Sequence, residues 1–282
     1  MRWGTGVDFY ASVILLCTTT KIVLSSISMS GIFSDSAVLR SASAPFVGAD
    51  DVVDTSAHEP RPAEKVPLTA VEPEGPPRGG IVVLHEAREI PESVLDLLRA
   101  LALEGWLAVA PNLFHRGHGD DKEVFGDDLF ADFDATSDWL VQRGVYPDCV
   151  GVIGFDDAGT AAFIVATSRP VGAAVSVAAA GIVEPLNSDA IALVDAAPKL
   201  QAPWLGLYGE DDPHTPPDHI EALRDAATRS SVATNVVSYS GVEHRADHPR
   251  EQPGSSDHSE PAEAALVDAQ TRIFDWFDSF MR

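Results

Sequence analysis

The sequence contains few cysteines and few aromatic residues. Only two cysteines, Cys17 and Cys149, occur in 282 residues, and 7% of the residues are aromatic. The two cysteines lie in segments of very different character, and no spacing typical of metal ligands connects them. The pattern therefore indicates neither a disulfide framework nor a cysteine metal site. We expect a protein of the reducing cytoplasm.

Basic residues are also scarce. The chain has 19 Lys and Arg against 43 Asp and Glu, which gives a formal net charge of -24 at pH 7. A surface of this charge repels nucleic acid and anionic lipid and favours solubility. We therefore expect a small-molecule substrate and neither nucleic acid nor a membrane as partner. With 45% hydrophobic residues, the chain has the composition of a globular protein with one α/β domain and an extension.

Long apolar runs are missing as well. The run "ASVILLC" is short, Lys21 soon interrupts the pattern, and a membrane helix needs about 20 apolar residues. A signal peptide is an alternative, because Arg2 precedes this apolar patch. Against it, Asp8 also precedes the patch and no small-residue cleavage site follows. A lipid anchor on Cys17 is weaker still, since the bulky Leu16 comes before it.

The first 79 residues differ from the remainder. Residues 1–45 are nearly neutral, and we interpret them as a disordered leader or as the product of a start codon assigned too early. In the second case, Met29 is one candidate for the true start. Residues 46–79 are rich in proline and acid, and we interpret them as a linker with an edge strand over 66–71. The folded domain is expected over 80–282.

From residue 80 onward, apolar strands alternate with amphipathic helices. The expected strands cover 80–86, 106–111, 149–155, 172–180, 202–209 and 235–241. The expected helices cover 91–105, 125–144, 157–169, 217–229 and 261–282. Strict alternation of this kind predicts an α/β fold with a mostly parallel, doubly wound sheet and helices on both faces.

Four chemically active side chains follow strand ends. Glu86, Asp156, Asp212 and His244 each come at or just after an expected strand. Active groups of such sheets gather at the carboxyl ends of the strands. The last three occur in the order nucleophile position, acid, histidine, which is the order of an α/β-hydrolase triad. Neighbouring acids at 210, 211 and 218 leave the choice of Asp212 open by one or two positions, although the spacing from Gly209 to Pro216 favours it.

Five motifs carry a specific resemblance. The stretches "VVLHEA", "EGWLAVAPNLF", "GFDDAG", "YGEDDPHTP" and "YSGVEH" occur in the order and spacing of the dienelactone hydrolase family, so that the chain from about residue 66 to its end resembles that family. The resemblance implies an α/β-hydrolase fold and cofactor-free hydrolysis of small lactones and esters by a Cys-His-Asp triad.

The resemblance also implies roles for individual residues. His244 would be the general base and Asp212 the acid that orients it. Glu86 would be the glutamate that helps to ionise the thiol. The backbone N–H groups of Ala87 and Asp157 would form the oxyanion hole.

One residue departs from the family pattern. Where the family has G-x-C-x-G-G, this chain reads "GFDDAG", with Asp156 in place of the nucleophilic cysteine. The small residues that a sharp strand-to-helix turn requires are kept. Aspartate also tolerates a positive φ better than most residues. We therefore expect the geometry of the turn to be kept while the thiol is lost.

Several roles for Asp156 are open. A carboxylate is a poor nucleophile toward an ester carbonyl, but haloalkane dehalogenases and epoxide hydrolases use one at this position to attack an alkyl carbon. With Glu86 nearby, like charges would raise one pKa, and the pair could then act as acid and base around a water molecule. The other hypotheses are a non-catalytic ligand-binding relative and an interaction protein whose acidic surface matters most.

The segment "HRGHGDD" offers two further candidates. Arg116 lies just past a strand end, where it could bind a substrate carboxylate; a solvated arginine is the alternative. His115, His118 and Asp120 lie near one another in the sequence and could suggest a metal site. However, no third strong ligand follows at a fixed spacing typical of such sites. We interpret this segment as a polar loop and expect no metal.

Overall fold

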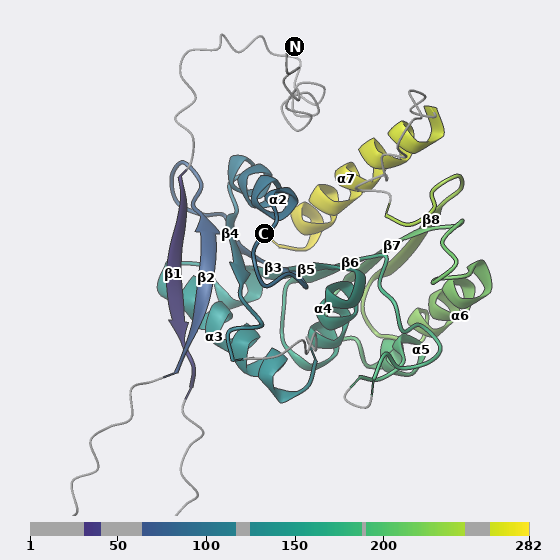
Figure 1. The fold of residues 1–282 in the computed structure, drawn as a ribbon, viewed down its shortest axis with the longest axis horizontal. Coiled ribbons are helices and arrows are strands. Elements are labelled where there is room, and N and C mark those ends of the chain that lie inside the picture. The colour runs from purple at the N-terminus through teal and green to yellow at the C-terminus, as the bar shows by residue number, and fades with distance from the viewer. Residues whose placement is uncertain (1–30, 41–63, 117–124, 188–189, 246–259, 282) are drawn as a thin grey trace, which may run out of the picture.

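The computed structural model describes residues 31–40, 64–116, 125–187, 190–245 and 260–281. The described residues contain an eight-stranded sheet with strand order β1-β2-β4-β3-β5-β6-β7-β8 (Figure 1). The strands are β1 (Ile32–Val38), β2 (Lys65–Val71), β3 (Gly80–Leu84), β4 (Leu107–Pro111), β5 (Val150–Phe155), β6 (Ala173–Val177), β7 (Trp204–Gly209) and β8 (Thr234–Tyr239).

The central and C-terminal parts of the sheet are parallel. Strands β4, β3, β5, β6, β7 and β8 pair in parallel, whereas β1 pairs antiparallel with β2 and β2 antiparallel with β4. Every residue of β3, β4, β5, β6 and β7 is buried. Continuous apolar strands of this kind need cover on both faces, which the helices supply.

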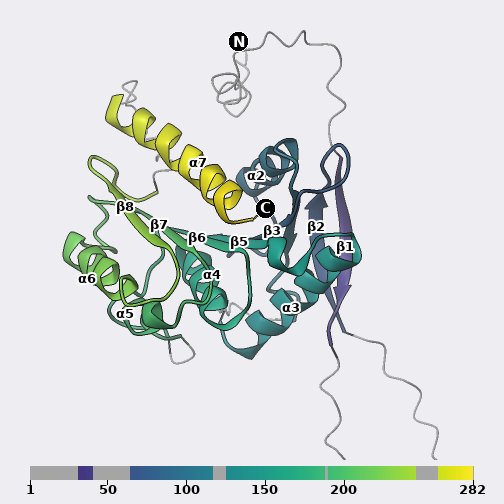
Figure 2. The ribbon, with the colours of Figure 1, turned by 180° about the vertical axis from the view of Figure 1, so that it is seen from behind.

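Two layers of helices cover the sheet. Figures 1 and 2 show α2 and α7 on one face and α3, α4, α5 and α6 on the other. The helices are α2 (Glu92–Leu103), α3 (Asp127–Gln142), α4 (Asp156–Ser168), α5 (Leu193–Ala196), α6 (Pro217–Ala227) and α7 (Glu260–Phe280), with short 3₁₀ turns over Pro147–Cys149 and Ala197–Lys199. The prediction of a doubly wound, mostly parallel sheet is confirmed.

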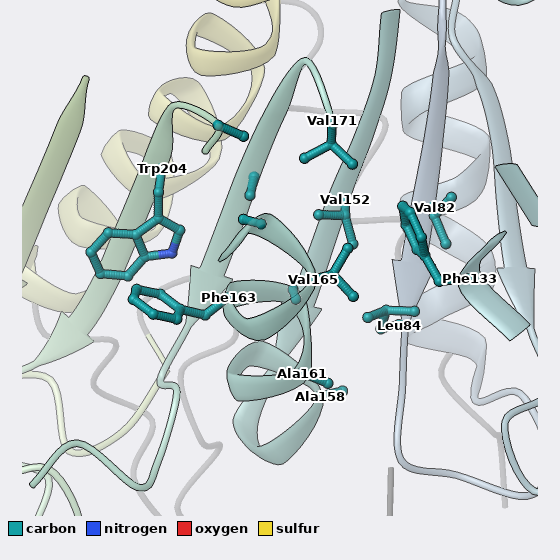
Figure 3. Close-up of a cluster of buried hydrophobic side chains, with 14 of the residues drawn as sticks. Val82, Leu84, Phe133, Val152, Ala158, Ala161, Phe163, Val165, Val171 and Trp204 are labelled. Carbon is teal, nitrogen blue, oxygen red and sulfur yellow. The ribbon is translucent and has the colours of Figure 1, made fainter. Parts of the chain in front are cut away.

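Helix α4 is fixed in place by aromatic and aliphatic packing (Figure 3). The ring of Phe163 on α4 meets Trp204 on β7 edge-on, with centroids 4.7 Å apart. The indole N–H of Trp204 donates to the hydroxyl of Ser176, at 3.0 Å. Val165 and Ala161 lie on the same buried helix and belong to the same core. A helix held this firmly fixes the position of the residue at its N-terminus, which is Asp156.

The N-terminal segment differs from the expectation. We expected residues 1–45 to lie outside the fold, but residues 32–38 form β1, which pairs with β2 from Ile32–Val71 to Val38–Lys65. The carboxylate of Asp35 accepts hydrogen bonds from the indole of Trp139, at 3.0 Å, and from Arg143, at 2.6 Å. The leader interpretation is therefore wrong for residues 32–38, and β2 is an interior strand rather than the edge. Residues 1–30 and 41–63 lie outside the described residues.

Within the described part of the chain, no helix combines the length and the apolar character that crossing a membrane requires.

Candidate active site

A sharp turn joins β5 to α4 at the carboxyl edge of the sheet. Asp156 is the first residue of α4 and has a φ of 56°, in the left-handed region. Two residues earlier, a Cβ on Gly154 would lie 1.9 Å from the carbonyl oxygen of Ala158, so only glycine fits there. The backbone thus has the geometry of a nucleophile elbow, with an aspartate at its tip.

Asp156, His244 and Asp212 lie together in space. The Nε2 atom of His244 is 2.8 Å from Oδ1 of Asp156, and its Nδ1 atom is 2.6 Å from Oδ2 of Asp212. The first contact is an ion pair of bent geometry rather than an aligned hydrogen bond. Asp212 is buried, and its Oδ1 accepts the backbone N–H of His214 at 2.8 Å. The structure thus brings the three predicted triad positions together.

The two carboxylates change the protonation of His244. The contact with Asp156 is the largest cause, and together with Asp212 it raises the pKa of the imidazole from its ordinary 6.5 to about 9, although partial burial acts in the opposite direction. His244 is therefore an imidazolium at neutral pH. A histidine in this state can donate a proton but cannot accept one.

Glu86 binds the N-terminus of α4. Its Oε1 atom accepts the backbone N–H of Asp157 at 2.5 Å and that of Ala158 at 3.2 Å. Burial is the largest cause that raises the pKa of this carboxyl, and the charge of Asp157 adds to it. Because Glu86 keeps an exposed surface, solvent weakens both effects. The N–H of Asp157, one of the two predicted oxyanion donors, is therefore occupied by an internal carboxylate. Ala87, the other predicted donor, follows Glu86 directly in the sequence.

Arg245 also reaches the elbow. Its Nη1 atom donates to Oδ2 of Asp156 at 3.4 Å, and its guanidinium carbon lies 4.2 Å from the ring centroid of Phe155. No sequence motif indicates this residue, and its position directly after His244 is the only signal that could have identified it. The site contains another acid, Asp157, whose pKa is raised by burial and by the charge of Asp156.

Arg116 is paired elsewhere. Its guanidinium donates two hydrogen bonds to the buried carboxylate of Asp132, at 2.9 and 2.6 Å, and one to Glu64, at 3.0 Å. His115 lies 3.2 Å from the same carboxylate. In the described part of the chain, no hydrogen bond or ion pair joins Arg116 to Asp156. Binding of a substrate carboxylate by Arg116 stays a prediction without support from these contacts.

The described residues contain no group of three or more side chains placed to hold a metal ion. Two members of the segment considered for that role, His118 and Asp120, lie outside the described residues.

Family comparison agrees with this fold. The sequence model of the dienelactone hydrolase family matches residues 67–281, and the chain belongs to that family. The family resemblance and the α/β-hydrolase fold predicted from the motifs are thus confirmed, and the chain is classed as a hydrolase.

Several relatives with similar sequences share one name. A protein of Yersinia pestis named "Putative carboxymethylenebutenolidase" is 29% identical over 216 residues, which is 70% of this chain and 76% of that protein. One of the same name from Methylorubrum extorquens is 30% identical over 231 residues, which is 75% of each chain.

Solved structures show the same fold. A structure described as a "Putative Dienelactone Hydrolase" from Klebsiella pneumoniae superposes with a TM-score of 0.67 at 24% identity and covers 88% of this chain and 99% of its own. A dienelactone hydrolase-like phosphotriesterase from metagenomic libraries superposes with a TM-score of 0.60 at 20% identity and covers 89% of this chain and 99% of its own.

Proposed function

We propose that this hydrolase opens a small strained substrate, such as an epoxide or a lactone, by attack of the Asp156 carboxylate on an alkyl carbon. A water molecule activated by His244 then hydrolyses the ester intermediate. The observation that carries the proposal is the ion pair between Asp156 and His244, at 2.8 Å, with Asp212 held 2.6 Å from the other ring nitrogen.

Three features of the site oppose the thiol route of the family. The chain has no thiol at the elbow, and a carboxylate that attacked an ester carbonyl would form an anhydride. A protonated His244 cannot take up a proton from a nucleophile. The backbone N–H of Asp157, which would stabilise an oxyanion, is bonded to Glu86.

The first step uses the proton that His244 already holds. One oxygen of Asp156 forms a bond to the alkyl carbon while the bond from that carbon to the ring oxygen breaks. The ring oxygen takes the proton from Nε2 of His244. The carboxylate becomes a neutral ester and the imidazolium becomes a neutral imidazole, so both charges of the ion pair disappear together.

The second step restores the ion pair. With the charge of Asp156 gone, the main cause of the raised pKa of His244 is gone too, and the imidazole can act as a base. It takes one proton from water, and the oxygen of that water attacks the ester carbonyl. The bond between this carbon and the Asp156 oxygen that carries the alkyl group breaks, so that this oxygen leaves in the product alcohol and takes the second water proton. Asp156 is again a carboxylate, and one of its oxygens now comes from water.

The test is turnover of small epoxides, lactones, haloalkanes and esters by the pure protein. Asp156→Asn should reduce the rate to below about one thousandth, because the nucleophile is lost. Asp148→Asn is the matched control: this exposed aspartate lies at the opposite end of β5 and should keep full activity.

A single turnover in heavy-oxygen water distinguishes a nucleophile from a base. The proposal predicts label in the carboxylate of Asp156, read by mass spectrometry of the peptide spanning 150–168. Label in the product alone, with an active enzyme, would contradict it and favour a general base.

A second candidate function is ligand binding without catalysis. The observation that favours it is the carboxylate of Glu86, which already occupies the N–H groups of Asp157 and Ala158. Absence of turnover on every substrate class, together with saturable binding of one of them in calorimetry, would support this candidate and exclude the first.

A further inference from the structure

We propose that Arg245 is a positioning residue of the elbow carboxylate: it holds one oxygen of Asp156 while His244 contacts the other. The proposal deepens the proposed function, since a carboxylate nucleophile must present one oxygen in a fixed direction. It rests on the contacts of the guanidinium with two successive residues of the elbow.

The contacts divide the two oxygens of Asp156 between two cations. Oδ1 lies 2.8 Å from Nε2 of His244, and Oδ2 lies 3.4 Å from Nη1 of Arg245. Because His244 and Arg245 are consecutive in the sequence, one loop after β8 supplies both cations. Rotation of the carboxylate would break both contacts, so its plane is fixed from two sides.

The ring of Phe155 supports the guanidinium. The guanidinium carbon of Arg245 lies 4.2 Å from the ring centroid, within the range of a cation–π contact. Phe155 is buried and is the last residue of β5. The planar guanidinium can therefore stack on the residue before Asp156 while one of its N–H groups reaches the carboxylate, which a flexible lysine does less well.

The charge balance of the site gives Arg245 a second effect. Asp156 and Asp157 begin α4, and Glu86 lies in the loop after β3. Asp212 follows β7, and Glu243 precedes His244. Arg245 stays charged throughout turnover, whereas His244 loses its proton in the first proposed step. The positive charge of Arg245 offsets part of the negative charge of Asp156 that stabilises the imidazolium of His244. The same positive charge also repels the imidazolium directly. Both effects oppose protonation of His244 and help it to become a base.

The test is an NMR titration of the imidazole of His244, which needs no substrate. In Arg245→Met the pKa of His244 should rise by about 0.5 to 1 above the wild-type value, because a neighbouring positive charge is lost. Arg245→Lys should restore most of the wild-type titration. Arg245→Gln, which keeps a polar side chain, should behave like Arg245→Met and serves if that variant does not fold.

A matched control removes the same charge elsewhere. Arg99 on α2 pairs with Glu92 and Asp96, and Arg99→Met should leave the titration of His244 unchanged. A well-folded Arg245→Met or Arg245→Gln protein with an unchanged pKa of His244 would overturn the positioning role.

If the wild type turns over no substrate, the proposed function fails, while the titration still tests Arg245. If the wild type is active, Arg245→Met should lower kcat about tenfold or more with little change in KM.

Discussion

The raised pKa of His244 predicts that the protein loses stability in mild alkali. The folded-state pKa of about 9 lies above the ordinary value of 6.5, so folding favours the protonated imidazole. Its contribution to the free energy of unfolding is fully present below pH 6.5 and disappears as the pH rises through 9. At about 1.4 kcal/mol per pH unit, the full effect is about 3 kcal/mol, and partial solvent exposure makes this an upper bound.

The same reasoning predicts the behaviour of Asp156→Asn. The contact with Asp156 is the largest cause of the raised pKa, so the variant should lose more than half of the rise and titrate between 6.5 and about 8. Its stability should therefore change less between pH 6.5 and 9.5 than that of the wild type. Chemical denaturation at a series of pH values gives both curves, and other titrating groups cancel in their difference.

Two results would refute this reasoning. Parallel stability curves for the two proteins would mean that the ion pair does not couple protonation of His244 to folding. An NMR pKa of His244 near 6.5 in the wild type would mean that Asp156 and His244 do not form the pair in solution.

Three further predictions test the elbow and the N-terminal strand. Asp156→Cys should hydrolyse an activated aryl ester at least about tenfold faster than Asp156→Cys/His244→Ala, because a thiol would find a histidine base and its orienting acid in place; equal rates would show that the imidazole is not aimed at the elbow. Gly154→Ala should destabilise the protein by more than about 3 kcal/mol, measured by denaturation, since its Cβ would lie 1.9 Å from the carbonyl oxygen of Ala158; a stability within about 1 kcal/mol of wild type would contradict the tight turn. Asp35→Ala should cost about 1 kcal/mol, seen as a lower melting temperature, because it removes the acceptor for Trp139 on α3 and for Arg143 just after that helix; an unchanged melting temperature would show that these bonds contribute nothing.

The sequence was sufficient to predict the central strands of the sheet and the three side chains that meet at its carboxyl edge. Continuous apolar strands and periodic helices are local signals, and five motifs in a fixed order placed Asp156, Asp212 and His244 at strand ends. The structure brings these three side chains together. The parallel orientation of the central strands followed from the alternation of strands and helices along the chain.

The remaining features depend on contacts between distant segments. The stretch "IFSDSAV" is short and half polar, and it becomes a strand only because β2 offers a partner some 30 residues later. The pairing of Arg116 with Asp132 depends on how α3 returns to the sheet. Neither the contact of Arg245 with Asp156 nor that of Glu86 with the N-terminus of α4 has a local pattern to reveal it.

The antiparallel strand β1 covers a sheet edge that would otherwise be formed by β2. The family match begins at residue 67, so a protein trimmed to that boundary would lack β1 and would start within β2. The backbone N–H and C=O groups of β2 that now bond to β1 would then face solvent, beside the apolar side chains of Leu68 and Ala70. An unpaired apolar edge is a template on which another chain can add a strand. β1, with its serines and aspartate, presents a more polar margin in its place.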